Sequence, residues 1–250
     1  IAGKIIAFDG KTMRGSKGEN SCGFHVLSAF LTDAQIVLGE VTCDEKSNEI
    51  TAIPELLDTI NVEGSIVTID AMGTQTKIAS KIIAKKADYC LALKGNQSSI
   101  HDDVKLYFES EKVKNVKKTL EKGHGRIERR EYYLETEIEW LYGRERWARL
   151  CSIGAVRSRV EAKGKTTEET RYFLTSLSNV DDFARAVRAH WGIENCLHWH
   201  LDVTFGEDSS KIRNKNAAGV WNVLRKLALE YLKKQASGGT SLKTRRKLAG

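Results

Sequence analysis

The sequence has 250 residues, of which 41% are hydrophobic, 29% charged and 8% aromatic, and its formal net charge is +7. This composition excludes wholesale disorder, because enough apolar side chains are present to form a substantial core. No apolar run is long enough to cross a membrane, and the first residues do not have the shape of a signal peptide. We therefore predict a folded cytoplasmic protein without a membrane partner.

Apolar runs in the first hundred residues alternate with helical patterns. The run 4–8 ends at Asp9-Gly10, which predicts a strand followed by a turn. The run 65–69 ends at Asp70 and is typical of a buried central strand. Further strands are expected at 24–31, 35–42 and 89–93, and helices at 47–60, opened by Ser47-Asn48-Glu49, and at 74–87. This order predicts a mixed α/β sheet with crossover helices.

The pattern changes after residue 97. Residues 98–122 are charged and predicted to be mostly helical, whereas 124–177 have strand character and suggest a mostly β insertion. Helices are expected again at 181–201 and 217–234. In the second, an apolar stripe is expected to face the core, with the basic residues outside it. The stripe is Val220, Leu224, Leu227 and Tyr231, and the basic residues are Arg225, Lys226, Lys233 and Lys234.

These elements suggest four parts, 1–97, 98–178, 179–236 and a basic tail at 237–250 that begins with a hinge at Ser237-Gly-Gly. The range 211–250 holds eleven Lys and Arg residues against one acid, Glu230, whereas 1–210 hold 29 basic and 32 acidic residues. A basic end on a slightly acidic body indicates a polyanionic partner, most simply nucleic acid, although a solubilising helix has the same composition. The five cysteines are an odd number without a Cys-x-x-Cys pair, which predicts reduced, buried thiols.

Three acids form the candidate catalytic set. Asp9 and Asp70 each follow an apolar strand, and Glu194 lies on the helix predicted after the last strand. Carboxylates that converge need a cation, and hard oxygen ligands select Mg²⁺ or Mn²⁺. Two such ions can clamp the attacking and leaving oxygens of a phosphoryl displacement. Taken singly, each acid is better explained as a cap, a turn former or a surface charge, and only the set of three in this element order favours a catalytic site.

His190, Glu194 and His198 are spaced four residues apart and offer an alternative metal face on the helix. The chain lacks the His-Glu-x-x-His core that would support this alternative. We therefore also consider His198 as a partner of the metal site or of the scissile phosphate.

Seven stretches in the same order resemble the DDE transposases of bacterial insertion sequences, in the group that includes the H-repeat-associated proteins. They are IAFDGKTMRGS (6–16), DEKSNEITAIPELL (44–57), IVTIDAMGTQ (66–75), YCLALKGNQ (89–97), HGRIERREY (124–132), RAHWGIENCLHWHLDVTFGEDSSKIR (188–213) and NVLRKLALEYLKK (222–234).

The resemblance implies a ribonuclease-H-like mixed sheet flanked by helices, with a β insertion before the Glu-bearing helix. It also implies Asp9, Asp70 and Glu194 as the metal triad. Arg188 matches an upstream Arg of the family that contacts DNA, but Leu201 occupies the position of its downstream Lys. The family's N-terminal helical region has no counterpart here, so we expect that an upstream segment is missing.

Basic and polar residues near the acids are candidate contacts to DNA. They are Lys11, Arg14, Lys94, Gln97, Arg126 and His198, together with Arg188. Solvated loop charges or ordinary turns are the alternatives for most of them. Contacts of this kind would be independent of base sequence and sensitive to salt.

The function that we expect is a transposase with two Mg²⁺ or Mn²⁺ ions that cleaves and joins double-stranded DNA at element ends. By analogy, it would act as a homo-oligomer at the bacterial nucleoid. Two alternatives stay open. One is a nuclease of the same fold without strand transfer, and the other is an inactive remnant that binds DNA.

Overall fold

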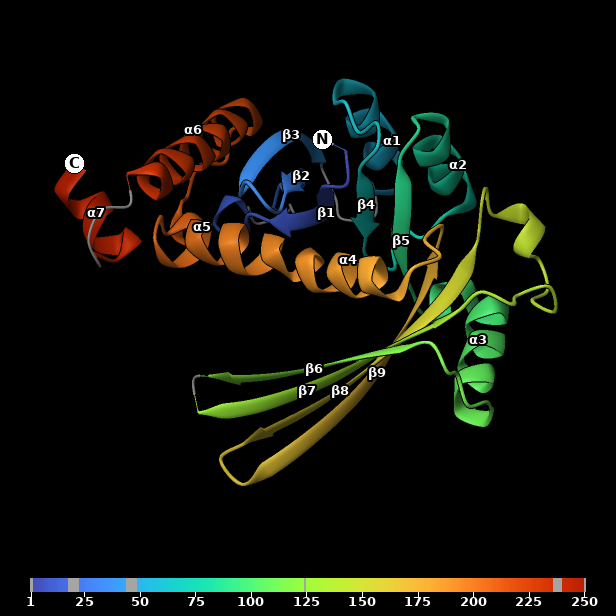
Figure 1. The fold of residues 1–250 in the computed structure, drawn as a ribbon. Helices are drawn as coiled ribbons and strands as arrows, with labels where there is room; N and C mark the ends of the chain where they lie inside the picture. The colour runs from blue at the N-terminus through green and yellow to red at the C-terminus, as the bar shows by residue number, and fades with distance from the viewer. Residues whose placement is uncertain (1, 18–22, 44–48, 124, 236–239, 250) are drawn as a thin grey trace. The chain divides into compact units, whose positions relative to one another are not determined.

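The computed structural model describes residues 2–17, 23–43, 49–123, 125–235 and 240–249. The chain forms two compact units, which we name after the acids that they carry. The Asp9 unit comprises Lys4–Asn61 and Ala189–Gly250, and the Asp70 unit comprises Ile1–Gly3 and Val62–Arg188. Figure 1 shows the elements of both. No described helix combines the length and apolarity needed to span a membrane.

The Asp9 unit contains an antiparallel sheet in the order β3-β2-β1. Its strands are β1 (Ile5–Thr12), β2 (His25–Leu31) and β3 (Ile36–Cys43). Helix α1 (Glu49–Thr59) follows β3 and buries Ala52, Ile53, Leu56 and Leu57. The residues expected to open this helix, Ser47 and Asn48, lie outside the described part of the chain.

The helices of the second half begin with α4 (Val180–Ile193), which continues through a π-helical turn (Glu194–His198) into α5 (Trp199–Val203). A short 3₁₀ turn (Glu207–Ser209), α6 (Lys215–Lys234) and α7 (Leu242–Ala249) follow. The predicted hinge at 237–239 lies outside the described residues. Ile193, Leu197 and Leu201 pack with Ala7 of β1 and Phe30 of β2, so these helices share a core with the sheet.

The Asp70 unit contains a mixed sheet in the order β4-β5-β9-β8-β7-β6. Strands β4 (Ile66–Ile69) and β5 (Asp88–Leu93) are parallel, and the crossover between them contains α2 (Thr76–Ala84). The other neighbours pair antiparallel through β9 (Lys165–Thr175), β8 (Ser152–Ala162), β7 (Arg126–Glu135) and β6 (Val116–Gly123). In Figure 1 these four strands form two long hairpins. The expected mixed sheet with flanking helices is confirmed.

Two predicted boundaries were wrong. The helix expected over 98–122 ends early, because α3 spans Ser98–Ser110 and Val116–Gly123 forms β6. Strand β6 is an edge strand whose lysines stay in solvent, and its pairing with β7 outweighs the local helical signal. The turn expected at Asp9-Gly10 is absent, since β1 continues to Thr12 in register with β2.

Gly10 is required by packing instead of by a turn. A Cβ atom at this position would overlap the imidazole of His25 and the carboxylate of Glu49. Both side chains are buried, and the distance from His25 Nε2 to Glu49 Oε1 is 2.5 Å. The missing side chain of Gly10 therefore lets the buried side chains of His25 and Glu49 lie directly beside the strand that carries Asp9.

The face that α6 turns inward is the opposite of the predicted one. Lys226, expected outside the apolar stripe, is only 4% exposed and donates to Ser28 Oγ at 2.8 Å and Glu40 Oε2 at 2.5 Å. Burial lowers the pKa of Lys226, although the Glu40 carboxylate opposes this. Helical periodicity defines two faces but not which one meets the protein, and here strands β2 and β3 supply partners for the basic face.

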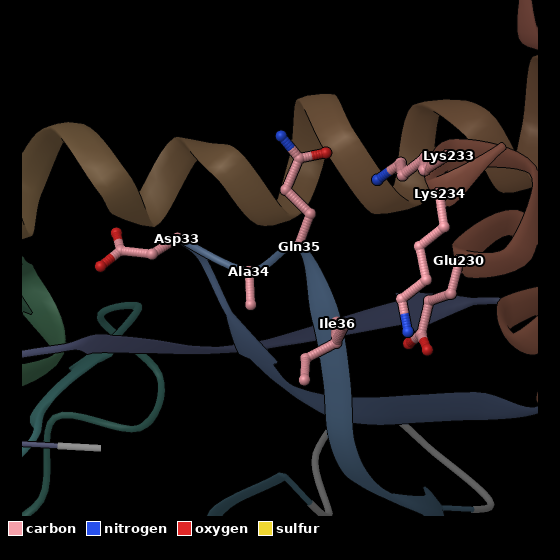
Figure 2. Close-up of a pocket in the computed structure, with 7 residues that line it drawn as sticks. All are labelled: Asp33, Ala34, Gln35, Ile36, Glu230, Lys233 and Lys234. Atoms are coloured by element: carbon pink, nitrogen blue, oxygen red, sulfur yellow. The ribbon is translucent and has the colours of Figure 1, made fainter. Parts of the chain in front are cut away.

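The C-terminal end of α6 repeats this pattern. Glu230 accepts a hydrogen bond from the backbone N–H of Val37 at 2.9 Å, and Lys233 donates to the carbonyl of Cys196 at 2.7 Å. Glu230, Lys233 and Lys234 line a pocket of about 300 Å³ together with the β2–β3 turn, residues 33–36 (Figure 2). Lys226 and Glu230 thus bond to the sheet on the inward side of α6, which also buries Ala218, Leu229 and Leu232.

None of the cysteines in the described part of the chain forms a disulfide. Cys43 and Cys90 are buried, whereas Cys151 and Cys196 are only half-buried. Cys22 lies outside the described residues.

Candidate active site

Asp9 lies in the middle of β1, opposite Ser28 of β2. Its Oδ2 atom is 3.3 Å from Nδ1 of His198, and the side chains are 19% and 12% exposed. Burial alone would raise the pKa of Asp9. The hydrogen bond from His198 and the charges of His198 and His190 outweigh it, so the pKa is held below its ordinary value. Asp9 is therefore an ionised carboxylate fixed on a rigid strand.

The π-helical turn Glu194–His198 decides which side chains lie near Asp9. A π turn inserts one residue into the helix, and such turns are frequent at functional sites. Leu197 stays in the core through this turn, whereas Glu194 is exposed. Nε2 of His198 is buried without a hydrogen-bond partner among the described residues. Nδ1 of His198 therefore contacts Asp9, whereas Nε2 makes no hydrogen bond within the described residues.

Lys11, two residues after Asp9, is held by three carboxylates. Its Nζ atom is 2.8 Å from Asp202 Oδ1, 3.0 Å from Glu207 Oε2 and 3.1 Å from Asp208 Oδ1. Burial would lower the pKa of Lys11, but the three carboxylates together raise it above its ordinary value. The side chain is 11% exposed. These contacts favour a supporting role for Lys11, which was expected to touch DNA.

Glu207 is fully buried at the centre of this network. Its Oε1 atom accepts a hydrogen bond from Asn222 Nδ2 at 2.7 Å, and Arg225 Nη1 lies 3.6 Å from the same oxygen. Sequence reasoning missed Glu207, Asp208 and Asn222, because a Gly-Glu-Asp run resembles a solvated loop. The only available signal was that 206–208 lie inside one of the matching stretches.

Asp70 follows β4 directly, as predicted. Its Oδ1 atom accepts hydrogen bonds from the backbone N–H groups of Met72 at 3.0 Å and Gly73 at 3.3 Å. This turn fixes one oxygen of the carboxylate. Asn96 Nδ2 donates to the carbonyl of Ala71 at 2.6 Å, and Gln97 Nε2 donates to the carbonyl of Thr74 at 3.0 Å. Gln97, expected at DNA, therefore braces the loop that orients Asp70.

The remaining basic candidates differ in the solvent exposure of their side chains and in their distance from acidic partners. Arg14 is 81% exposed and lies 3.8 Å from Asp208, and Lys94 is exposed. Arg126 is 56% exposed and lies 3.7 Å from Glu128. Arg188 is 46% exposed and donates two hydrogen bonds to Glu121, at 3.0 and 3.1 Å. Arg14, Lys94 and Arg126 are thus the most accessible, and Arg188 would have to exchange Glu121 for a phosphate.

The donor chemistry of the three predicted acids fits a hard divalent cation, since Asp9, Asp70 and Glu194 offer only carboxylate oxygens. Within the described residues, no three His, Cys, Asp or Glu side chains are gathered closely enough to hold a metal ion. Within the Asp9 unit this applies both to the alternative face of His190, Glu194 and His198 and to Asp9 with Glu194 and any third such side chain. The π turn also breaks the spacing of four residues on which that alternative depended.

The sequence was compared with protein-family models and with known proteins, and both comparisons match transposases. The family model described as "Transposase DDE domain" matches residues 2–230. The chain is 42% identical over 264 residues to a putative transposase YncI of Escherichia coli O157:H7, covering 99% of this chain and 66% of the relative. It is 39% identical over 240 residues to the H repeat-associated putative transposase YhhI of E. coli K12, covering 91% of this chain and 64% of the relative. The chain thus spans about two thirds of the length of these relatives.

Among solved structures, the fold resembles the piggyBac transposase in a synaptic complex with hairpin DNA. The TM-score is 0.58 at 11% identity, and the match covers 99% of this chain and 52% of that chain. At this identity the likeness concerns the fold alone, and it places the chain among ribonuclease-H-like folds.

Proposed function

The chain belongs to the transposase DDE-domain family, and on this premise we propose that it cleaves and joins DNA at the ends of an insertion sequence. The observation that carries the proposal is the family match over residues 2–230, a range that contains Asp9, Asp70 and Glu194. The expected substrate is double-stranded DNA, on which the protein would act as a homo-oligomer at the bacterial nucleoid.

Asp9, Asp70 and Glu194 are the proposed ligands of two Mg²⁺ or Mn²⁺ ions. When bound, these ions would activate the attacking hydroxyl and neutralise charge on the phosphoryl group. The protein's part is to hold its carboxylates ionised and oriented. Asp9 is kept ionised by His198, and Asp70 is oriented by the N–H groups of Met72 and Gly73.

Phosphate contacts are proposed for the accessible cations Arg14, Lys94 and Arg126, and for Arg188 once it leaves Glu121. Lys11 and Gln97 support the proposed ligands, each through the contacts described above. His198 lies against Asp9 and can act next to the reacting phosphate. Because phosphate contacts carry no base information, their loss should weaken binding to all duplexes alike and reduce its salt dependence.

The test is cleavage of a labelled duplex that carries the inverted repeats flanking the gene, with Mg²⁺ or Mn²⁺. Asp70→Asn preserves the shape of the side chain but removes a ligand charge. We expect it to reduce the rate by more than about 100-fold, because even partners of metal ligands cost 10–100-fold when lost. Asp102→Asn, at a 76% exposed side chain in the same unit, is the matched control and should retain the wild-type rate.

Three outcomes would contradict the proposal. Equal rates for the wild type and Asp70→Asn would exclude Asp70 as a ligand. Cutting without preference for the repeats would indicate a nuclease. Binding to DNA without any metal-dependent cleavage would indicate an inactive remnant.

A further inference from the structure

Helix α6 turns an uncharged surface to the solvent. Between Ala217 and Leu232, every exposed residue is apolar or aromatic, and the charged residues Arg225, Lys226 and Glu230 are not exposed. The exposed set is Val220 (59%), Trp221 (49%), Val223 (41%), Leu224 (47%), Leu227 (55%) and Tyr231 (62%). We call these six residues the α6 face. Contiguous exposed apolar surface of this kind is typical of an interaction site.

The spacing within the α6 face is that of a helix–helix seam. Val220, Leu224, Leu227 and Tyr231 are separated by four, three and four residues. Alternation of three and four keeps side chains on one narrow stripe and lets them interlock with a second helix. Trp221 and Val223 widen the stripe on its two sides. The spacing therefore fits a helical partner better than an extended peptide.

We propose that the α6 face pairs with the same face of a second copy of this chain. In a twofold-symmetric contact, each residue near the axis meets its own copy. A charge there would face an identical charge, which disfavours the contact. The α6 face has no such charge, and the exposed lysines of the helix, Lys215 and Lys234, lie at its two ends. Helices that cross near Leu224 and Leu227 keep those ends apart.

The basic residues of α6 argue against a membrane as the occupant. Helices that lie on lipid surfaces point Lys and Arg outward from their polar face, toward the headgroups. Here Lys226 is bound to Glu40, and Arg225 lies beside the buried Glu207. The only polar side-chain atoms within the α6 face are the Tyr231 hydroxyl oxygen and the Trp221 indole nitrogen. An apolar protein surface therefore fits this face better than anionic lipid.

The exposed area of the α6 face allows the affinity of the proposed dimer to be estimated. An aromatic side chain buries about 150–250 Å² in full, and Val and Leu bury less, so these six side chains at roughly half exposure offer on the order of 500 Å² per copy. Two copies together would bury on the order of 1,000 Å², at the lower limit for a specific interface. The proposal thus predicts a weak dimer that exchanges with monomer at micromolar concentrations.

Sedimentation equilibrium of this chain, without DNA or metal, tests the pairing. We expect the wild type to dimerise with increasing concentration and Leu224→Glu to weaken the dimer more than about tenfold. Leu106→Glu is the matched control, because Leu106 is 65% exposed on α3, an element of the Asp70 unit, and its replacement should leave the dimer unchanged. A monomeric wild type, or equal dimers in all three proteins, would overturn the proposal.

A mixing experiment distinguishes pairing between copies from misfolding. Leu224→Glu and Leu224→Lys should each be monomeric alone and should form a heterodimer when mixed, because residue 224 meets its own copy at the axis. Failure of the mixture to associate, although the wild type dimerises, would place the interface elsewhere and refute the assignment to α6. The inference extends the self-association included in the proposed function. Neither experiment requires DNA cleavage. Failure of the predicted dimerisation would therefore not contradict the proposed catalytic activity.

Discussion

Replacement of Lys11 by Met separates the two roles considered for this residue. Lys11 is 11% exposed, and three carboxylates lie within 3.1 Å of its Nζ atom, one of them on the fully buried Glu207. Removing one partner of a buried ion pair costs about 3–5 kcal/mol, because the other charge is left buried and unpaired. We therefore expect Lys11→Met to lower the free energy of unfolding by about that amount.

Urea unfolding followed by circular dichroism measures this loss as a shift in midpoint at unchanged slope. Lys4→Met is the matched control, since Lys4 precedes the same strand but is 51% exposed and pairs with Asp33 at 3.1 Å on the surface. Its loss should stay below about 1 kcal/mol. If the two variants lost equal stability, the buried network would not support β1 as we infer. A Lys11 that contacts phosphate would instead keep its stability and lose DNA affinity with a reduced salt slope.

The pH dependence gives a second check on Lys11. The pKa of Lys11 is raised in the folded protein, because the three carboxylates outweigh the effect of burial. A raised pKa means that the stabilisation is fully present below the ordinary value of 10.5 and is lost only as pH rises through the higher folded value. The stability difference between wild type and Lys11→Met should therefore be constant from pH 7 to about 10. A difference that disappeared near neutral pH would contradict the assignment.

Three further predictions follow from single contacts. Gly10→Ala should destabilise the protein by at least about 1–3 kcal/mol through overpacking, whereas Gly95→Ala, where a Cβ meets nothing within 4 Å, should not lower the melting temperature measurably. Arg188→Ala breaks a surface pair with Glu121, so it should cost less than about 1 kcal/mol of stability but weaken DNA binding at low salt in a titration. Mn²⁺ should raise the melting temperature of the wild type but not of Asp70→Asn, and equal shifts would argue against metal binding at Asp70.

The sequence by itself determined the features that depend on local pattern. The buried run 66–69 with Asp70 after it, the strands of the first hundred residues and the helices at 181–201 and 217–234 were predicted from apolar periodicity and confirmed, whereas α7 lies in the segment expected to be only a basic tail. The matching stretches were sufficient to identify the family. These features are encoded between near neighbours in the chain, so they can be read without knowing what packs against what.

Tertiary structure decided which face of an element meets the protein and which charges are paired. The stripe of α6 was located correctly, but Lys226 turned inward because Ser28 and Glu40, far away in the chain, offer it partners. Lys11 likewise pairs with Glu207, a partner that is distant in the sequence. The periodicity of apolar residues does not tell which face of a helix is buried. The residues next to a charged side chain in the sequence do not reveal its distant partner either. Only the packed chain decides between the two faces, because it brings into contact residues that lie 197 and 198 positions apart.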